Sequence, residues 1–464
     1  MPEMTRRTAI AAAGLLPTTL AGPAPAQPAT PALAPPPPPA ARPLFGATAW
    51  SLPNGLRVVL AESRRVPVVS HYLFYAAGGG EDPAGRSGLA HFLEHMMFKG
   101  SPHVPPGAFS LAVAREGGQD NAFTSRDVTA YHQTVEASRL PLVMRMEADR
   151  FAGPLLPPET VEPERAVVLE ERRQRTDSNP RARFFEAFEA ALYGRQHWRG
   201  RPIIGWEEEI RALTREDLHT FYERRYAPAN AVLVVTGDVR EAELRRLVEE
   251  FYAPIPARPA LPRDRAAPPE AAVEPRLTRR DPTVREATFL RAYMAPSLTW
   301  GDADAAWALE LLAHLLGSGP GSRMYRALVE TGLATSASAS YDSEAMGVAS
   351  FTLSATARPG TTPEALEAAV DAVLAKLLQE GPAEAERTRA ARQLTAGALL
   401  ALDGIGAAPR MLGGALAIGL ELETVEFWPA RLRAVTLEQV TAAGRSLLGS
   451  APSTTGWLLP GSAS

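Results

Sequence analysis

The chain contains 464 residues, of which 45% are hydrophobic and 22% charged, and this composition is typical of a globular protein with more than one domain. Its net charge of -4 at pH 7 argues against nucleic-acid binding, because there is no excess of lysine and arginine to neutralise phosphates. The absence of cysteine excludes disulfides, thiolate catalysis and metal sites with cysteine ligands.

Residues 1–26 have the pattern of an export signal. Arg6 and Arg7 precede a short apolar stretch, which ends at a small-residue cleavage site of the type Ala-Pro-Ala. The paired arginines favour the twin-arginine route, and an ordinary signal peptide is the alternative. We therefore expect a periplasmic protein that begins near Gln27 and has no membrane span, because no later apolar run approaches ~20 residues. Residues 27–43, which include five consecutive prolines, predict an extended linker.

The first domain is predicted to span residues 44–255 and to mix strands with helices. Segments rich in β-branched and aromatic residues predict strands, and Ser87 is a suitable N-cap for the helix that follows it. Pro163 suits the first turn of a later, strongly charged helix. The expected strands cover residues 56–60, 66–77 and 231–236, and the expected helices cover residues 88–98, 163–175, 183–192 and 240–252.

Residues 256–283 are rich in proline and arginine and show no periodicity, so they are predicted to link two domains. In the second domain, residues 284–460, the order of elements repeats that of the first in outline. We therefore predict an α+β fold built from two similar domains. The expected strands of the second domain cover residues 288–294 and 347–355, and its expected helices cover residues 305–316, 363–378 and 383–401.

The motif His91-Phe92-Leu93-Glu94-His95 carries the chemistry of the first domain. On a helix, positions 91 and 95 lie on one face with position 94 beside them, because one turn takes 3.6 residues. Two imidazoles at this spacing can bind one zinc ion, and a carboxylate between them can act as a general base toward water at the metal. With 8 histidines in the chain, the pattern arises by chance roughly 0.01 times per chain, so a plain polar helix face explains it poorly.

A hydrolytic zinc site needs a third protein ligand and keeps one position open for water. The charged segment that begins at Pro163 offers Glu164, Glu170 and Glu171. Glu164 and Glu171 are two helical turns apart and therefore share one face. Spacing alone does not choose among the three carboxylates.

Residues 88–100, Gly-Leu-Ala-His-Phe-Leu-Glu-His-Met-Met-Phe-Lys-Gly, resemble the signature of the pitrilysin/insulinase peptidases, in the branch that contains mitochondrial processing peptidase. The similarity continues to Gly237-Asp238 and covers nearly all of the first domain. The resemblance implies two similar domains that enclose a substrate chamber. Its further motifs are Gly117-Gly118, Asn121-Ala122-Phe123-Thr124, Asp149-Arg150, residues 164–171, residues 200–205 and residues 226–231.

Carried over to this chain, the resemblance implies that His91, His95 and Glu171 hold the metal. It implies that Glu94 is the general base and that Glu164 supports the site from behind the ligands. Glu171 lies 76 residues beyond His95, as the family pattern requires.

Asn121 and Ala122 match the segment at which family members hold the substrate as an added strand, through its main chain more than its side chains. For Asn121, the alternative is an ordinary turn residue. In the second domain, the helix that contains His314 occupies the position of the metal helix but has no H-x-x-E-H pattern. We therefore expect one zinc ion per chain.

The second domain departs from the family pattern at a position that matters for activity. Active single-chain members carry an arginine and, seven residues later, a tyrosine, which closure of the two halves places against the substrate carbonyl. The segment here is one residue shorter, and the corresponding positions are Val329 and Thr335. Neither side chain can replace the lost donors. Losing such a donor typically costs ~10²–10³ in rate. We therefore predict a heterodimer in which a related chain supplies the pair, with Arg326 of this chain as the alternative.

These features predict a zinc-dependent endopeptidase that hydrolyses peptides or unfolded protein segments in a closed chamber. One alternative is a non-catalytic structural subunit, like the core proteins of respiratory complexes that share the fold. Another is a processing peptidase dedicated to one peptide precursor. The complete metal motif argues against the structural subunit, and a zinc assay separates the two.

Overall fold

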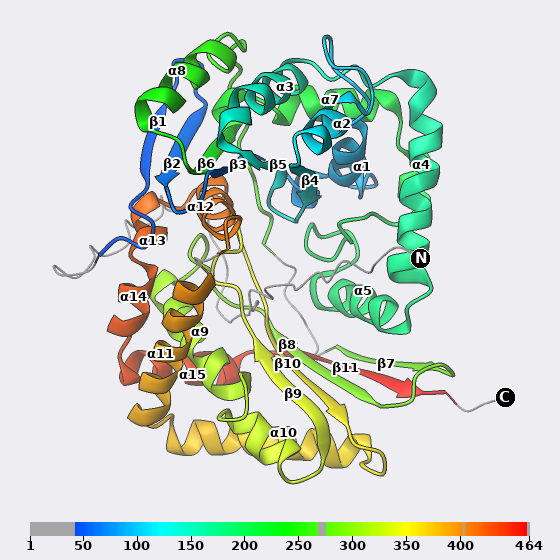
Figure 1. Cartoon of the computed structure of the whole chain (residues 1–464). Coiled ribbons are helices and arrows are strands. Elements are labelled where there is room, and N and C mark those ends of the chain that lie inside the picture. Colours follow the sequence, from blue (N-terminus) through cyan, green and yellow to red (C-terminus); the bar gives the residue numbers. More distant parts are fainter. Residues whose placement is uncertain (1–41, 268–274, 402–403, 462–464) are drawn as a thin grey trace. The chain divides into compact units, whose positions relative to one another are not determined.

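The computed structural model describes residues 42–267, 275–401 and 404–461 (Figure 1). The predicted signal peptide, residues 1–26, and the predicted linker up to residue 41 lie outside the described residues.

The chain divides into two compact units. The first unit comprises residues 42–267 together with residues 395–431. The second unit comprises residues 275–394 together with residues 432–461. Each unit is built around one β-sheet.

The sheet of the first unit has six strands in the order β1-β2-β6-β3-β5-β4. Neighbouring strands are antiparallel except β2 and β6, which are parallel. Among the described strands, β4 is paired on one side only, and its other edge is open. The strands are β1 (Thr48–Ser51), β2 (Arg57–Glu62), β3 (Val68–Tyr75), β4 (Gln119–Thr124), β5 (Thr129–Glu136) and β6 (Ala231–Gly237).

The sheet of the second unit has five strands in the order β7-β11-β8-β10-β9. If β1 is set aside, both sheets have the same topology: the first, fifth, second, fourth and third strands in chain order lie side by side, and only the first and fifth are parallel. The two units are thus copies of one α+β arrangement, as predicted. The strands are β7 (Arg276–Asp281), β8 (Thr288–Tyr293), β9 (Ala334–Ser340), β10 (Phe351–Ala357) and β11 (Ser453–Pro460).

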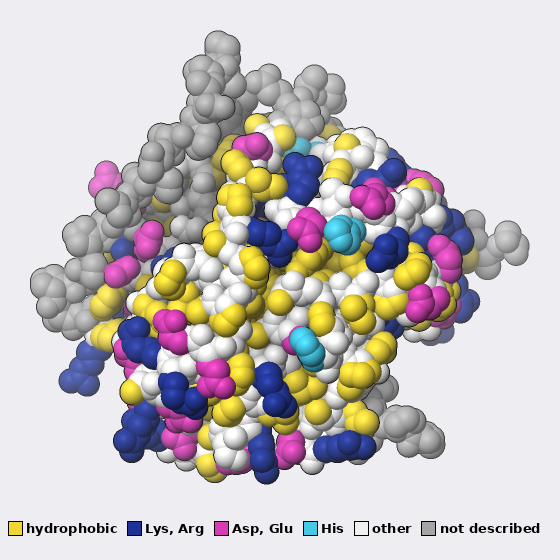
Figure 2. Space-filling view, turned by 90° about the horizontal axis from the view of Figure 1, so that it is seen from above, with side chains coloured by type: hydrophobic (Ala, Val, Ile, Leu, Met, Phe, Trp, Pro, Cys, Tyr) yellow, Lys and Arg dark blue, Asp and Glu magenta, His cyan; other side chains and the backbone are white. Residues whose placement is uncertain are grey.

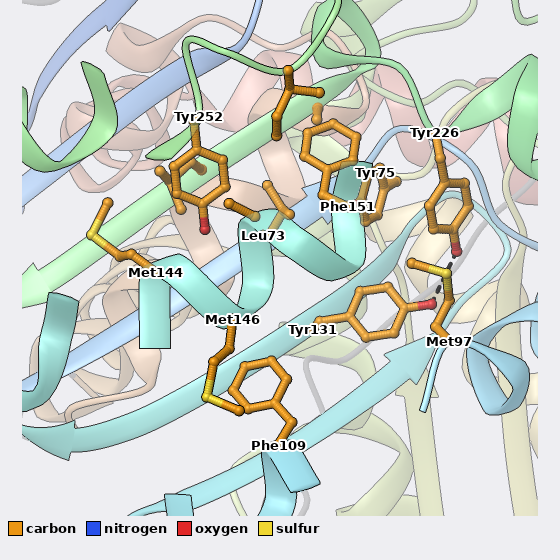
Figure 3. Packing of buried hydrophobic residues seen from close by; sticks show 14 of the residues in the cluster. Leu73, Tyr75, Met97, Phe109, Tyr131, Met144, Met146, Phe151, Tyr226 and Tyr252 are labelled. Atoms are coloured by element: carbon orange, nitrogen blue, oxygen red, sulfur yellow. Dashed lines mark hydrogen bonds between the residues drawn. The ribbon is translucent and has the colours of Figure 1, made fainter. Parts of the chain in front are cut away.

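The core of the first unit lies between its sheet and helices on one face of that sheet. Tyr75 of β3 packs there against the rings of Phe151 and Tyr226, with centroid distances of 5.0 and 3.9 Å (Figure 3). The hydroxyl groups of Tyr131 and Tyr226 lie 3.2 Å apart and so satisfy each other inside this core. The helices that precede residue 267 are α1 (Leu89–Met96), α2 (Ala108–Arg115), α3 (Leu140–Ala152), α4 (Pro158–Arg172), α5 (Pro180–Tyr193), α6 (Glu207–Ala212), α7 (Arg215–Arg225) and α8 (Glu241–Phe251).

The opposite face of the first sheet is covered by a segment from far along the chain. Helix α12 (Ala407–Ala417) packs on β3 and β6 (Figure 1). The approach is so close that a Cβ on Gly413 would lie 2.1 Å from the ring of Phe74. After it, α13 (Leu422–Glu426) ends at Glu426, whose carboxylate accepts the backbone N–H groups of residues 45–47.

Residues 395–431 therefore belong to the compact unit that carries the H-x-x-E-H motif. This differs from the predicted ranges, which place all of residues 284–460 in the second domain. The contacts of α12 with β3 and β6 join residues far apart in the chain, and no local sequence pattern predicts them.

Helix α9 of the second unit follows the second strand of its sheet, as α1 does in the first unit. It packs on β9 and on α15. The division between the two units falls within α11 and α14. The remaining helices are α9 (Ala303–Gly317), α10 (Pro363–Glu380), α11 (Glu384–Ala401), α14 (Trp428–Ala434) and α15 (Leu437–Ser450).

Among the described residues, no helix is both long and apolar enough to cross a membrane. On the face shown in Figure 2, Lys and Arg side chains are scattered among Asp and Glu side chains and do not gather into one basic patch. This face therefore lacks the electrostatic footprint of a nucleic-acid-binding surface.

Candidate metal centre

Helix α1 carries the motif, and a residue outside the helix fixes where it starts. The two carboxylate oxygens of Asp82 accept hydrogen bonds from the backbone N–H groups of Gly88 and Ala90, each 2.8 Å long. Gly88 is the N-cap, with φ of 87°, and a Cβ there would lie 2.5 Å from the carbonyl oxygen of Ile204. Only glycine fits this position, because the backbone is left-handed and the neighbouring chain is close.

A predicted capping residue and a predicted helix start are wrong. Ser87 does not cap α1, because its hydroxyl accepts a hydrogen bond from the backbone N–H of Trp206 (2.9 Å). Helix α4 begins at Pro158 and not at Pro163. The earlier proline occupies the first turn, and Pro163 lies inside the helix, where it removes one backbone hydrogen bond.

The structure brings together the three side chains predicted to hold the metal. Nε2 of His91 and Nε2 of His95 lie 3.7 and 3.3 Å from the same atom, Oε2 of Glu171. The three ligand atoms all lie within 4.8 Å of one another. Atoms ~2.0–2.2 Å from a shared zinc ion in tetrahedral geometry lie ~3.3–3.6 Å apart, so the two distances to Glu171 are close to those that such an ion requires.

Helix α4 separates the three carboxylates that the sequence offered as a third ligand. Glu171 faces the histidines. Oε1 of Glu164 lies 2.9 Å from Nδ1 of His95 and its other oxygen pairs with Lys99. Glu170 is exposed, and its carboxylate is bonded by two side chains of the next turn. Glu164 and Glu171 thus contact the site from one helix face, and Glu170 does not.

The electrostatics of the centre favour a cation. Burial lowers the pKa of His95, but hydrogen bonds with Glu164 and Glu171 outweigh it and raise the value to about 9. Burial raises the pKa of Glu171, but the hydrogen bond from His95 and the charges of His91 and Arg175 lower it to about 2. Burial and then the charge of His95 lower the pKa of His91 to about 4. Two ionised carboxylates therefore face one neutral imidazole and one that readily takes a positive charge.

Nδ1 of His91 is buried and has no hydrogen-bond partner among the described residues. Metal-binding histidines usually donate this hydrogen bond to a carboxylate or carbonyl. The two imidazoles of the site therefore differ: Glu164 orients the ring of His95, and packing alone orients the ring of His91. The ring centroids lie 4.8 Å apart at an angle of 70°.

Glu94 is linked to the edge of the sheet. Its Oε2 accepts a hydrogen bond of 2.6 Å from the hydroxyl of Thr124, the last residue of β4. Burial raises the pKa of Glu94 above its ordinary value, and the hydrogen bond from Thr124 opposes this shift. A carboxylate with a raised pKa near a metal suits proton transfer near neutral pH.

The two residues predicted to bind substrate lie on β4. Asn121 is exposed, and its side-chain oxygen accepts a hydrogen bond of 2.8 Å from the backbone N–H of Ala122. Ala122 is opposite Tyr131 of β5, so its side chain faces the core and α1. Neither side chain contacts His91 or His95 through a hydrogen bond or ion pair. What Asn121 and Ala122 share is their position on β4, the strand at the open edge of the sheet.

Within the described part of the chain, the second unit contains no comparable cluster of metal-binding side chains. On α9, Nε2 of His314 lies 3.0 Å from the side-chain oxygen of Gln393. Val329 ends the π-helical turn η5 (Tyr325–Val329), and the hydroxyl of Thr335 on β9 donates to the carbonyl of Thr356 (3.4 Å). Arg326 is exposed.

Four residues of the site were missed in the sequence: Asp82, Lys99, Thr124 and Arg175. A signal for Arg175 exists, because it lies four residues after Glu171 on a charged helix and such pairs interact. Lys99 and Thr124 stand within motifs of the family resemblance, residues 88–100 and 121–124, but spacing alone gives them no role. No local pattern marks Asp82, which reaches the start of α1 from a preceding turn.

Two family models match the chain. The one described as Insulinase (Peptidase family M16) matches residues 57–205, and the one described as Peptidase M16 inactive domain matches residues 212–394. An uncharacterized zinc protease of Mycobacterium leprae is 33% identical over 410 residues, which are 87% of this chain and 89% of that protein. The chain therefore belongs to the insulinase family of peptidases, M16.

Other relatives agree with this assignment. Zinc protease PqqE of Helicobacter pylori is 30% identical over 346 residues, 72% of this chain and 76% of that protein. A mitochondrial-processing peptidase beta subunit of Blastocladiella emersonii is 27% identical over 270 residues, 58% of this chain and 56% of that protein. The crystal structure of a protease from Helicobacter pylori has the same fold, with a TM-score of 0.81 at 24% identity over 90% of this chain and 100% of that one. The predicted family and fold class are confirmed.

Proposed function

We propose that the chain is a zinc-dependent endopeptidase that hydrolyses peptides or unfolded protein segments in a closed chamber. The observation that supports this is the convergence of His91 Nε2, His95 Nε2 and Glu171 Oε2 on the helix pair that also carries Glu94. Zinc held by these three side chains would polarise the scissile carbonyl and lower the pKa of a bound water. In this proposal the zinc-binding domain is residues 44–255 together with residues 395–431. The metal-free second domain is the remainder of residues 284–460 together with β7, which lies within the predicted linker, residues 256–283.

The surrounding side chains have separate tasks. Glu94 takes the proton of the attacking water and later delivers it to the leaving amine. Thr124 holds the Glu94 carboxylate in place through its hydrogen bond. Glu164 accepts the Nδ1–H of His95, which leaves Nε2 of that ring as the acceptor that a metal requires. Lys99 keeps Glu164 ionised by pairing with its second oxygen.

The substrate binds as an extended strand along the open edge of β4, at Asn121 and Ala122. Main-chain hydrogen bonds at a sheet edge need no particular side chain, but they need an extended segment. The substrate is therefore a peptide or an unfolded segment. A single dedicated precursor is one substrate of this class.

The metal and the base give the decisive test. The purified full-length chain should hold close to one zinc ion, and Glu94→Gln should keep the metal while losing hydrolysis of an unfolded peptide. Zinc bound at full occupancy without any peptide hydrolysis, alone or with a partner chain, would favour the structural-subunit alternative. Loss of zinc in Glu94→Gln would show that Glu94 is a ligand and not the base.

A related chain completes the site in this proposal. Val329 and Thr335 cannot donate to a substrate carbonyl as an arginine and a tyrosine would. Addition of a partner that carries that pair should raise the peptidase rate. Full activity of the isolated chain, unchanged in Arg326→Ala, would exclude both the heterodimer and its alternative within this chain.

Export to the periplasm by the twin-arginine route rests on the pattern of residues 1–26. Protein recovered from the periplasm should begin near Gln27, and replacing Arg6 and Arg7 by lysine should leave precursor in the cytoplasm. Unchanged export of that variant would favour the general secretory route.

A further inference from the structure

The face of the first sheet that α12 covers in part carries a row of rings ending at the open edge. Residues paired across neighbouring strands place their side chains on the same face. Asn121 of β4 is paired with His132 of β5, which is paired with Tyr72 of β3. In the next row, Phe123 of β4 and Phe74 of β3 flank a small residue of β5.

These rings form one packed group, the edge cluster, which consists of Tyr72, Phe74, Phe123 and His132. The rings of Tyr72 and His132 are stacked, with centroids 4.5 Å apart and planes at 6°. Phe123 meets Phe74 edge-on at 6.1 Å and lies 6.3 Å from His132. The edge cluster is thus a rigid aromatic surface that reaches the last strand of the sheet.

Arg410 of α12 extends over the edge cluster. Its Nε donates to the hydroxyl of Tyr72 (3.3 Å), and its guanidinium carbon lies 5.5 Å from the ring centre of Phe123. The residue is exposed, and within the described residues no acidic side chain forms an ion pair with it. Arg410 is therefore an accessible cation held over an aromatic ring by two fixed contacts.

Among the described residues, Arg410 is the charged side chain that contacts the edge cluster. Burial, followed by the charge of Arg410, lowers the pKa of His132 to about 4, so this imidazole is neutral near pH 7. The acidic groups of the site, Glu94 and Glu171, belong to helices on the opposite face of the sheet, the face toward which Thr124 and Ala122 point. An added strand at β4 would therefore face carboxylates on one side and a cation on the other.

An added strand brings its own side chains within reach of Arg410. Side chains alternate between the two faces, so every second residue of the strand points toward the edge cluster. A residue directly opposite Phe123 places its Cβ roughly 4.5–5.5 Å from that of Phe123. A carboxylate two bonds further out can then meet the guanidinium that lies over the Phe123 ring.

We infer that Arg410 is a specificity-determining residue, which selects peptides with an aspartate or glutamate at the position that faces Phe123. This inference rests on the proposed function, because it takes the open edge of β4 as the place where substrate binds. It adds the chemical class of the substrate: an extended segment with an acidic side chain at one position near the cleaved bond. The pair would form at an exposed site, so the preference should be modest, roughly two- to fivefold.

The experiment compares one unstructured peptide in three forms, with Asp, Asn or Lys at a single position that is moved along the sequence on both sides of the cleaved bond. Binding is measured with full-length Glu94→Gln, and kcat/KM is measured with the active chain. At one position, we expect Asp to bind and react roughly two- to fivefold better than Asn. Arg410→Gln should abolish that difference, and Arg410→Glu should shift the preference to Lys.

Arg246→Gln is the matched control, because Arg246 is an exposed arginine of the same unit whose ion pair is with Glu250 of its own helix. It should leave the preference for Asp unchanged. Peptides that bind or react without any charge preference, or a preference that survives in Arg410→Gln, would overturn the inference and leave the proposed function standing. If no peptide binds or reacts at all, either with the chain alone or with a partner chain added, the proposed function itself fails, and the inference fails with it.

Discussion

The guanidinium of Arg175 forms an ion pair with Oε1 of Glu171, while Oε2 of the same carboxylate faces Nε2 of both motif histidines. Arg175 lies in the π-helical turn η3 (Arg173–Asp177), which continues α4. The wider turn places the arginine beside the carboxylate four residues earlier. One oxygen of Glu171 is thus held by the protein, and the other is left for a metal.

Arg175→Gln should weaken zinc binding about tenfold, because partners that orient a ligand typically contribute 10–100-fold in metal affinity and this arginine is half exposed. Competition with a chromogenic chelator measures the effect. Arg175→Lys should recover part of the affinity. The control is Arg173→Gln in the same turn, since Arg173 pairs with Glu170 and should not affect zinc. Equal losses in the two glutamine variants would show that the turn and not the ion pair matters.

Glu171→Gln and Glu170→Gln form a second matched pair of variants. The first should lose zinc, because an amide is a poor replacement for a carboxylate ligand and Glu171 alone of the two faces the histidines. The second should keep close to one zinc ion per chain. Metal content of the purified proteins is the measurement, and loss of zinc in Glu170→Gln with retention in Glu171→Gln would reverse the assignment.

Asp82 should make the stability of the protein depend on pH. Burial raises its pKa from 3.8 to about 7 in the folded chain. A raised value means that its contribution to stability is fully present below pH 3.8 and is lost as the pH rises through about 7. Asp82→Asn removes this titration but leaves one backbone N–H at the start of α1 without an acceptor, which costs about 1–3 kcal/mol.

The free energy of unfolding in urea, compared between wild type and Asp82→Asn, tests this expectation. The free energy of unfolding of wild type minus that of Asp82→Asn should be more positive at pH 5 than at pH 8, because only wild type loses stability as Asp82 ionises. A difference that is the same at both pH values would show that Asp82 does not titrate in this range.

Gly413 and Gly414 test the packing of α12 on the first sheet. A Cβ on Gly413 would lie 2.1 Å from the ring of Phe74, so Gly413→Ala should force the helix away and destabilise the protein by about 1–3 kcal/mol. Gly414 has nothing within 4 Å of its Cβ position, and Gly414→Ala should be neutral or stabilise by about 0.5–1 kcal/mol through helix propensity. Thermal unfolding distinguishes the two, and similar effects from both would mean that α12 does not pack as described.

Much of the secondary structure could be predicted, because its signals are local. The strands β3 and β6 and the helices α8 and α10 lie close to their predicted ranges. Helix α5 starts at Pro180, three residues before its predicted start, because the side chain of Asn179 accepts hydrogen bonds from N–H groups of the first turn. The edge strands β1, β4, β7 and β9 were missed, because short strands with exposed, polar or small residues have little pattern of their own. The interior strands β5 and β11 were missed as well.

The sequence by itself determined His91, Glu94 and His95 as one functional group. Their spacing of three and four residues needs only one turn of helix to bring them to the same face, and a helix has a fixed geometry.

Only the tertiary structure decided which residues meet that group from elsewhere. The orientation of α4 against α1 turns Glu171 and Glu164 toward the histidines and Glu170 away, a choice that the spacing of the residues left open. The tertiary structure likewise decided that Asp82 accepts the hydrogen bonds at the start of α1. It also decided that α12 packs on the first sheet. Such contacts depend on how separate elements pack. A local stretch of sequence does not predict a partner that lies tens or hundreds of residues away.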